Sequence, residues 1–273
     1  MRPDTGVKER AAMMFYHGQG DFAERYTEVL HPFTDRGVRC IITDLPGHGY
    51  SPGKRGHSGN QMVLDSLILD GLAEADGLPC GIGGHSMGGM LAVRHALLVK
   101  RGVLPELAFL WLSSPLLKPS LRVPAWQLKL IPLLAPLMPS LTIPTGVTRE
   151  MCRDDHDGGD EESSAPRFQL WHGKVSIGWG SFLLEEEQKI NRELRGEPWK
   201  AAPQILITQG ADDPVCPPSY GREFSSLLAK LAGQQCVSYQ EIEGVLHEPF
   251  MGEKSYRVFA VLDDWLDGVL REM

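Results

Sequence analysis

The sequence is poor in cysteine, has no basic excess and contains no long apolar run. Its five cysteines are odd in number, lie far apart and form no C-x-x-C pair, which argues against a disulfide scaffold and favours a reducing compartment. Acidic residues outnumber basic ones by 35 to 27, and the resulting charge of −8 argues against nucleic acid as a partner. No apolar run reaches transmembrane length, and residues 1–10 lack the apolar segment of a signal peptide. A cytoplasmic location is therefore predicted.

The 273 residues are enough for one large domain with an insertion, and 42% of them are apolar, as is usual in globular proteins. Short apolar segments alternate with helical patterns, which predicts a mostly parallel sheet with helices on both faces. The predicted strands are residues 11–16, 38–43, 78–82, 107–112, 205–208 and 237–242. One predicted helix begins near Phe22 and bends at Pro32, and another begins after Ser86. Further helices are predicted over residues 64–75, 220–231 and 256–270.

Residues 84–89 read GHSMGG, a G-x-S-x-G sequence between a short apolar segment and a helical pattern. This is the context of a nucleophile elbow. Glycines at positions 84 and 88 let neighbouring backbone pass close by, while the tight turn strains Ser86 and lifts its hydroxyl clear of the sheet. The helix that follows directs unpaired N–H groups to the place where negative charge would develop. The pattern alone is weak, so its meaning depends on the residues that accompany it.

Two further residues complete a catalytic triad with Ser86. Asp213 follows the predicted strand 205–208, and His247 follows the predicted strand 237–242. Serine, aspartate and histidine therefore come in the order expected of an α/β-hydrolase, each near the carboxyl end of a strand. His247 is the predicted general base. The resemblance to α/β-hydrolases implies Asp213 as the acid, because it lies three residues beyond Gly210, as the acid does in the G-x-x-D motif of the family, and Pro214 follows it. Asp212 stays open as the alternative acid.

A glycine-rich loop, HGQG at residues 17–20, follows the first predicted strand. Such a loop can offer a backbone N–H group to an oxyanion, here that of Gln19. The residue after the predicted nucleophile, Met87, offers a second N–H group. These two groups predict an oxyanion hole, so acyl transfer to and from Ser86 needs neither a metal nor an organic cofactor.

With these motifs, the sequence resembles the monoacylglycerol lipase and lysophospholipase branch of the α/β-hydrolases, and the resemblance covers nearly the whole chain. The motifs that carry it are HGQG followed by Arg25-Tyr26, DLPGHGYS at 44–51, GKRG at 53–56, GHSMGG at 84–89 and SSP at 113–115. The resemblance implies the α/β-hydrolase fold with an inserted cap, and monoacylglycerols or lysophospholipids as substrates. It also implies that His17 and His48 brace backbone turns, whereas His85 points away from the nucleophile.

The sequence departs from this branch at three places. Asp21 stands where the branch has a glutamate, so its side chain is one methylene shorter. Gly81 and Gly83 lie in the strand before Ser86, where bulkier residues are usual, and they weaken that strand locally. Only about a dozen residues precede the first strand, where the branch has an extra β-hairpin, so the sheet is expected to be shorter at one edge.

The strand and helix alternation breaks between residues 114 and 203, which predicts a cap. The predicted division is core residues 1–114, cap residues 115–202 and core residues 203–273. Residues 126–143 are apolar but are interrupted by Pro132, Pro136 and Pro139, which excludes a regular spanning helix. This segment either packs the cap onto the core or lines an acyl-chain site, and the two are compatible. The candidate substrate-binding residues are Leu130, Leu133, Leu134, Leu137, Met138 and Trp171.

Residues 154–162 form an acidic run, DDHDGGDEE, whose spacing does not match a calcium-binding EF-hand loop. A solvated loop is the expected structure, and no metal site is predicted. Four apolar residues beyond the run are expected to anchor the cap: Phe168, Leu170, Trp171 and Trp179. Alternatively, residues 171–173 face the mouth of the pocket.

The predicted function is hydrolysis of small-molecule carboxylic esters, with lipid-like esters implied by the resemblance. A short-chain carboxylesterase, a thioesterase and a peptidase are alternatives on the same fold, whereas Ser86 at the elbow disfavours a dehalogenase or epoxide hydrolase with an aspartate nucleophile. A non-catalytic ligand-binding protein of the same fold is the alternative from another class. The cap is also a candidate for peripheral contact with a membrane.

Overall fold

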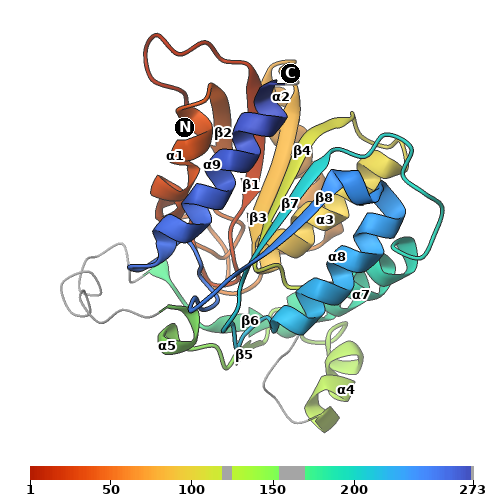
Figure 1. Cartoon of the computed structure of the whole chain (residues 1–273). Coiled ribbons are helices and arrows are strands. Elements are labelled where there is room, and N and C mark those ends of the chain that lie inside the picture. Colours follow the sequence, from red (N-terminus) through yellow and green to blue (C-terminus); the bar gives the residue numbers. More distant parts are fainter. Residues whose placement is uncertain (119–124, 154–169, 272–273) are drawn as a thin grey trace.

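The computed structural model describes residues 1–118, 125–153 and 170–271, with the side chains of residues 125–129 left out of the description. Its centre is a six-stranded sheet in the order β2-β1-β3-β4-β7-β8, and every neighbouring pair of strands is parallel (Figure 1). The strands are β1 (Ala11–Tyr16), β2 (Val38–Ile42), β3 (Cys80–His85), β4 (Leu107–Ser113), β7 (Gln204–Gly210) and β8 (Val237–Ile242). The predicted α/β fold with a mostly parallel sheet is confirmed.

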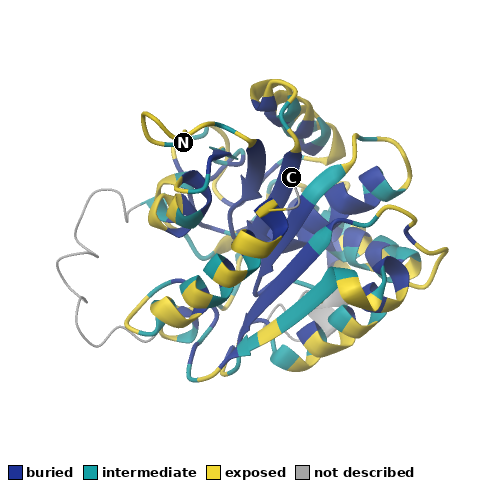
Figure 2. Ribbon diagram, turned by 45° about the horizontal axis from the view of Figure 1, so that its top comes forward, coloured by how far each residue is buried: buried dark blue, intermediate teal, exposed yellow. Residues whose placement is uncertain are grey.

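Helices cover both faces of this sheet, and each face has its own apolar core. On one face lie α2 (Gln61–Ala75), α3 (Met87–Lys100), α7 (Ile177–Glu193) and α8 (Pro218–Ala232). On the other lie α1 (His31–Thr34) and α9 (Ser255–Arg271). Figure 2 shows the central strands as buried and the outer faces of the helices as exposed, which is the pattern of a parallel sheet covered on both sides.

The helix expected to begin near Phe22 is wrong as a single element. The chain instead forms three short pieces, η1 (Ala23–Tyr26), η2 (Glu28–Leu30) and α1. Pro32 explains the break, because proline lacks an N–H group and fits only the first turn of a helix, where it lies in α1. The residues predicted to form one apolar face are nevertheless buried, since Tyr26, Val29 and Phe33 lie in the core beneath α9.

Gly81 and Gly83 of β3 pack against large side chains of the neighbouring strands. A Cβ on Gly81 would overlap the ring of Phe109, and a Cβ on Gly83 would overlap the side chain of Met13. The pairing of β3 with β4 also shifts register between Cys80 and Ile82. Bulky side chains of the adjacent strands therefore fill the volume that a larger residue would occupy in β3.

Between β4 and β7 the chain leaves the central sheet. This segment contains α4 (Ala125–Leu134), β5 (Thr142–Pro144), α5 (Arg149–Cys152), β6 (Lys174–Ser176) and α7, and β5 pairs with β6 in an antiparallel ribbon. Helix α4 includes Pro132 and ends two residues later. The division into a core and a cap at residues 114 and 202 stays a prediction. The acidic run 154–162 and Phe168 lie outside the described residues.

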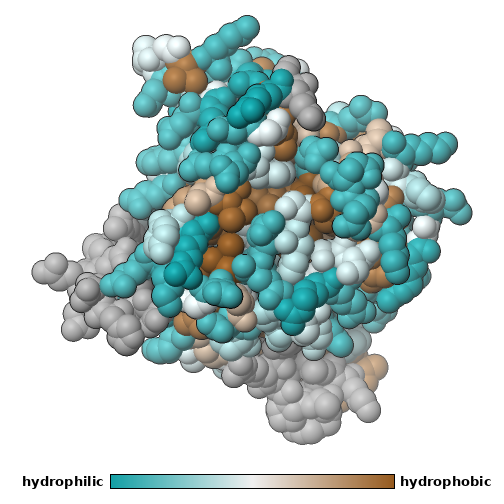
Figure 3. Space-filling model, in the orientation of Figure 1, coloured by the Kyte–Doolittle hydropathy of each residue, from teal (hydrophilic) through white to brown (hydrophobic). Residues whose placement is uncertain are grey.

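The surface of the molecule is mostly hydrophilic on the face drawn in Figure 3, where apolar side chains gather around the edge strand β8, between α8 and α9. Within the described ranges, no helix is both long and apolar enough to cross a bilayer. The cytoplasmic location stays a prediction.

Candidate active site

Ser86 occupies a strained turn between β3 and α3. Its backbone has φ 53° and ψ −119°, a conformation that a residue with a side chain rarely adopts. Neighbouring glycines make this turn possible, because a Cβ on Gly84 would overlap the Gly88 carbonyl group and a Cβ on Gly88 would overlap the Tyr16 carbonyl oxygen. The geometry expected of a nucleophile elbow is therefore present at Ser86.

Ser86, His247 and Asp213 form one hydrogen-bonded chain. His247 Nε2 lies 2.9 Å from Ser86 Oγ, and His247 Nδ1 lies 2.8 Å from Asp213 Oδ2. All three residues are buried, with 9%, 4% and 3% of the surface of Ser86, His247 and Asp213 exposed. In this arrangement the imidazole can accept the serine proton while the carboxylate stabilises the positive charge that forms.

The carboxylate of Asp213 is held from several sides. Its Oδ1 accepts hydrogen bonds from the N–H groups of Val215 and Cys216 at 2.8 and 2.9 Å, and its Oδ2 accepts one from Gln209 Nε2 at 2.9 Å. Asp212 is exposed, and its backbone N–H donates to the Val245 carbonyl. The structure therefore places Asp213, and not Asp212, against the histidine.

Glu248 and Gln209 contact the triad region and were not singled out from the sequence. Arg25 Nη2 lies 2.8 Å from Glu248 Oε2, and Arg25 Nη1 lies 2.9 Å from Asp21 Oδ1, with all three side chains buried. Burial opposes the charge of Arg25, but the two carboxylates raise its pKa well above the usual value. The ion pairs therefore join the loop after β1 to the residue that follows His247, even though Asp21 is shorter than glutamate.

The loop at residues 17–20 lies beside Ser86, since a Cβ on Gly18 would lie 3.6 Å from Ser86 Cβ. Among the described residues, neither the Gln19 N–H nor the Met87 N–H has a hydrogen-bond acceptor. Both groups are therefore available to a ligand, and their role as an oxyanion hole belongs to the proposal below.

The other buried histidines near the site brace backbone. His17 Nδ1 lies 2.8 Å from the Gly18 carbonyl oxygen, and its Nε2 accepts a hydrogen bond from the Leu45 N–H at 2.9 Å. His48 Nδ1 lies 3.1 Å from the Pro46 carbonyl oxygen, and burial lowers the pKa of His48 to about 2. His85 Nδ1 lies 3.1 Å from the Ser113 carbonyl oxygen. Burial, and then the nearby His247, lowers the pKa of His85 well below its usual value.

The candidate substrate-binding residues lie on the surface of the inserted segment. Leu133 and Leu137 are 68% and 78% exposed, Leu130, Met138 and Trp171 are also exposed, and Leu134 is half-buried. Ile131 is buried and holds α4 in place. The contact of these side chains with substrate stays a prediction.

The segment at residues 171–173 contacts the core instead of standing free. The His172 N–H donates to the Gly20 carbonyl oxygen at 2.9 Å, and His172 Nε2 lies 3.1 Å from the Gly47 carbonyl oxygen. Of the three described residues predicted to anchor the cap, Trp179 is fully buried and Leu170 is half-buried, but Trp171 is exposed, because the backbone of residues 172–174 and not the Trp171 ring makes the contact with the core. The segment therefore docks on the loop that carries Gln19.

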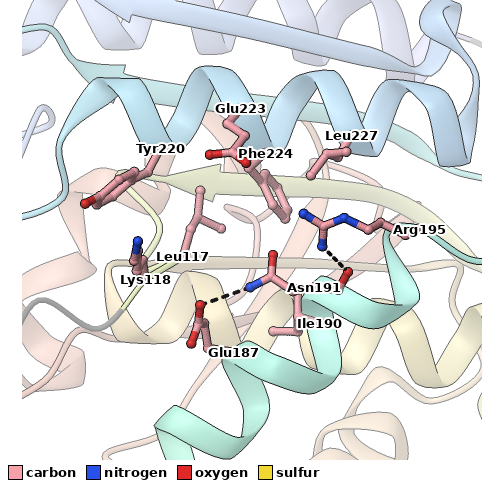
Figure 4. A pocket seen from close by; sticks show the side chains of 10 residues that line it. All are labelled: Leu117, Lys118, Glu187, Ile190, Asn191, Arg195, Tyr220, Glu223, Phe224 and Leu227. Carbon is pink, nitrogen blue, oxygen red and sulfur yellow. Dashed lines mark hydrogen bonds between the residues drawn. The ribbon is translucent and has the colours of Figure 1, made fainter. Parts of the chain in front are cut away.

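A separate cavity of about 350 Å³ lies between α7 and α8 (Figure 4). Leu117, Ile190, Phe224 and Leu227 provide its apolar lining, and Lys118, whose Nζ lies 5.1 Å above the Tyr220 ring, stands at one end. No triad residue lines this cavity.

Within the described ranges, one set of side chains has metal-ligand spacing: potential donor atoms of Asp213, Cys216 and His247 lie within 4.8 Å of one another. The Asp213 carboxylate and the His247 imidazole are already hydrogen-bonded to each other. Burial, and then Asp213, raises the pKa of the Cys216 thiol well above its usual value, which disfavours the thiolate that binds metals. The set therefore suits proton transfer better than metal binding.

Comparison with known protein families identifies the family of this chain. Residues 7–255 match the family described as serine aminopeptidase, S33, a hydrolase family. The chain belongs to this family. The resemblance to its lipase branch is confirmed, because the chain is 27% identical to a phospholipase of Bacillus subtilis, YtpA, over 91% of this chain and 92% of that protein. It is also 25% identical to a monoacylglycerol lipase of Mycolicibacterium smegmatis, over 97% of this chain and 90% of the other.

Solved structures show the same fold. The crystal structure of a monoacylglycerol lipase of Paleococcus ferrophilus matches with a TM-score of 0.81 and 24% identity, over 97% of this chain and 96% of the other. The match also extends to one much longer protein. The chain spans 26% of an uncharacterized abhydrolase domain-containing protein of Dictyostelium discoideum, to which it is 29% identical.

Proposed function

We propose that this chain is a serine hydrolase that cleaves carboxylic esters of lipid-like substrates, such as monoacylglycerols or lysophospholipids, through an acyl-enzyme. The observation that carries the proposal is the hydrogen-bonded chain from Asp213 through His247 to Ser86, with separations of 2.8 and 2.9 Å. The chain ends on a serine hydroxyl in a strained turn at the start of a helix. Serine, histidine and aspartate in this relation constitute the machinery of acyl transfer.

In the proposed mechanism, Ser86 Oγ attacks the ester carbonyl carbon while its proton moves to His247 Nε2. Asp213 stabilises the resulting imidazolium through His247 Nδ1. The N–H groups of Gln19 and Met87 bind the oxyanion of the tetrahedral intermediate. His247 then protonates the leaving alcohol, and an activated water molecule hydrolyses the Ser86 ester by the same steps.

Two kinds of observation favour a lipid-like ester over other acyl compounds. Relatives that match most of the chain are a phospholipase and a monoacylglycerol lipase. Helix α4 and the residues that follow it expose large apolar side chains, among them Leu133 and Leu137. Exposed apolar residues of this kind suit contact with an acyl chain or a lipid surface. A peptidase stays the second candidate, because the family description names an aminopeptidase.

Labelling with a fluorophosphonate probe tests the serine mechanism and separates it from a non-catalytic ligand-binding role. The wild-type protein is expected to be labelled and to hydrolyse esters, whereas Ser86→Ala is expected to lose both properties while remaining folded. Removal of a triad member costs roughly 10⁴-fold or more in turnover. Ser226→Ala, at an exposed serine of α8 whose hydroxyl donates to Arg222, is the matched control. Unchanged ester hydrolysis in Ser86→Ala would contradict the proposal.

A further inference from the structure

The side chain of Gln19 is held by the inserted segment. Gln19 Nε2 donates to the Lys174 carbonyl oxygen at 2.7 Å, and Gln19 Oε1 accepts a hydrogen bond from Trp179 Nε1 at 3.0 Å. Lys174 lies in β6 and Trp179 in α7, so both contacts come from the chain between β4 and β7. The backbone N–H of Gln19 is one of the two groups proposed to bind the oxyanion. Its position therefore depends on residues outside the loop that carries it.

The same indole group also contacts the residue that bears the second proposed donor. Trp179 Nε1 lies 3.2 Å from Met87 Sδ, so a single N–H group lies against both Gln19 and Met87. Gln19 lies in the loop after β1, whereas Met87 is the first residue of α3. The indole bridges them where their backbone N–H groups have no acceptor among the described residues.

Trp179 is itself fixed in place. It is fully buried in the first turn of α7, where Ser176 Oγ accepts its backbone N–H at 3.1 Å. Its ring lies parallel to that of Phe182, with the ring centres 5.0 Å apart and 12° between the planes. An indole with a capped backbone and a stacked ring has little freedom to rotate. It can therefore define the distance between the loop that carries Gln19 and the first turn of α3.

The contact between His172 and Gly20 supports the same loop from its other end. The His172 N–H donates to the Gly20 carbonyl oxygen at 2.9 Å, and a Cβ on Gly20 would overlap the His172 carbonyl oxygen. Residues 172–179 thus contact both Gln19 and its neighbour. The close approach leaves no space for the loop to shift toward the inserted segment.

We infer that Trp179 is a positioning residue for the oxyanion hole: its indole N–H sets the relative position of the Gln19 and Met87 backbone N–H groups. This inference rests on the proposed function. Oxyanion stabilisation depends on donors placed in advance at hydrogen-bond distance from the developing charge. A misplacement of about 1 Å can reduce turnover about 100-fold. The inserted segment therefore contributes to the chemical step as well as to the surface around it.

Trp179→Phe tests the inference, because it keeps an aromatic ring in the stack and removes only the N–H group with its part of the indole. The expected result is a fall in kcat of about 10- to 100-fold with KM changed by no more than about two-fold. Trp111→Phe is the matched control: Trp111 is also fully buried, and its Nε1 donates to Thr208 Oγ1 at 3.2 Å, a partner outside the proposed machinery. This control is expected to keep kcat within about two-fold.

A thionoester substrate distinguishes a displaced oxyanion hole from a general loss of packing, because loss of packing would lower kcat/KM for the ester and the thionoester equally. Its thiocarbonyl sulfur is larger than oxygen and accepts hydrogen bonds poorly, so a well-formed oxyanion hole favours the oxygen ester strongly. In Trp179→Phe the ratio of kcat/KM for the ester to that for the thionoester is expected to fall. Equal losses on both substrates, or an unchanged kcat on the ester, would overturn the inference.

Gln19→Met gives a second route that leaves the tryptophan in place. It removes the acceptor for the indole N–H and the donor to Lys174 while keeping the backbone N–H, and it is expected to lower kcat and the same ratio. The double variant with Trp179→Phe is expected to lose less than the sum of the two single losses in activation free energy, because both changes break the hydrogen bond between Trp179 and Gln19. Additive losses would overturn the inference. A wild-type protein without Ser86-dependent hydrolysis would instead contradict the proposed function itself, and the inference with it.

Discussion

At the scale of single residues, the site is defined by which carboxylate reaches the histidine. Asp213 receives hydrogen bonds from Gln209, Val215, Cys216 and His247, so both of its oxygens are engaged. A carboxylate held in this way is fixed in orientation. Its neighbour Asp212 is exposed. Two adjacent residues of identical chemistry therefore have different surroundings, and this difference can be measured.

Asp213→Asn is expected to reduce kcat about 10⁴-fold, because an amide cannot stabilise the imidazolium and can hold His247 in the wrong tautomer. Asp212→Asn is the matched control. It is expected to change kcat by less than about three-fold, because the side chain of Asp212 is exposed and Asp213 is the carboxylate that contacts the histidine. Steady-state hydrolysis of a p-nitrophenyl ester provides the comparison. The opposite ranking of the two variants would mean that Asp212 is the acid.

At the scale of elements, buried charges join the loop after β1 to the loop after β8. Arg25 bonds to Asp21 on its own side and to Glu248 beside the histidine, and the three side chains are at most 8% exposed. Tyr26 adds a hydrogen bond from its hydroxyl to Asp21 Oδ2 at 2.8 Å. Because two separate loops share these charges, loss of the central arginine affects the fold and the placement of His247 together.

Arg25→Met is expected to lower the free energy of unfolding by about 3–5 kcal/mol, because it leaves two carboxylates buried without their cation. Urea denaturation followed by circular dichroism measures the change. Arg257→Met, at an exposed arginine of α9, is the control and is expected to change stability by less than about 0.5 kcal/mol. A loss of under about 1 kcal/mol in Arg25→Met would show that the buried pairs contribute little.

Helix α4 and the residues after it carry the predicted preference for long acyl chains. If Leu134 and Leu137 contact the acyl chain, each added substrate methylene gains up to about 0.8 kcal/mol until the site is full, so kcat/KM rises from acetyl to longer esters. Leu134→Asp and Leu137→Asp are expected to flatten this rise while changing acetyl ester turnover less. Met62→Asp, at an exposed methionine of α2, controls for a general effect of surface charge. A wild-type preference for acetyl esters would contradict the lipid-ester substrate but not the serine mechanism.

The elements show which features can be read from the chain and which cannot. Each of the six predicted strands is present, because each apolar or alternating segment is bounded by loop residues and pairs with a neighbour in the sheet. The single helix predicted from Phe22 is absent. The apolar spacing of residues 26–33 is helical, but Pro32 interrupts the helix, and this local effect outweighs the spacing. Within the site, local motifs indicated the residues that the structure brings together at Ser86. The contacts of Glu248 and Trp179 join segments far apart in the sequence, and no local pattern signals them.

At the scale of the whole molecule, buried neutral histidines tie stability to pH. Burial lowers the pKa of His48 to about 2 and that of His95 to about 3, and it also lowers the pKa values of His17 and His85. Below pH 6.5 the unfolded chain therefore binds more protons at these positions than the folded chain does. The free energy of unfolding therefore falls as the pH falls from 6.5.

His48 and His95 are each expected to contribute about 1.4 kcal/mol per pH unit below pH 6, which gives a slope of about 3 kcal/mol per unit together, and His17 and His85 act in the same direction. Urea denaturation at pH 6.0, 5.5 and 5.0 measures this slope. His48→Asn is expected to reduce it by about 1.4 kcal/mol per unit, whereas His31→Asn, at an exposed histidine, is expected to leave it unchanged. Equal slopes for wild type and His48→Asn would mean that His48 takes up a proton in the folded protein.

The most direct test of the central claim is to identify the residue that receives the acyl group. The protein is mixed with a p-nitrophenyl carbamate, whose carbamoyl group leaves a serine slowly, and the release of p-nitrophenol and the masses of the digested peptides are recorded. The account predicts a stoichiometric burst of p-nitrophenol and a carbamoyl group on Ser86, with neither in Ser86→Ala. A carbamoyl group on another residue, or an equal burst in Ser86→Ala, would contradict it.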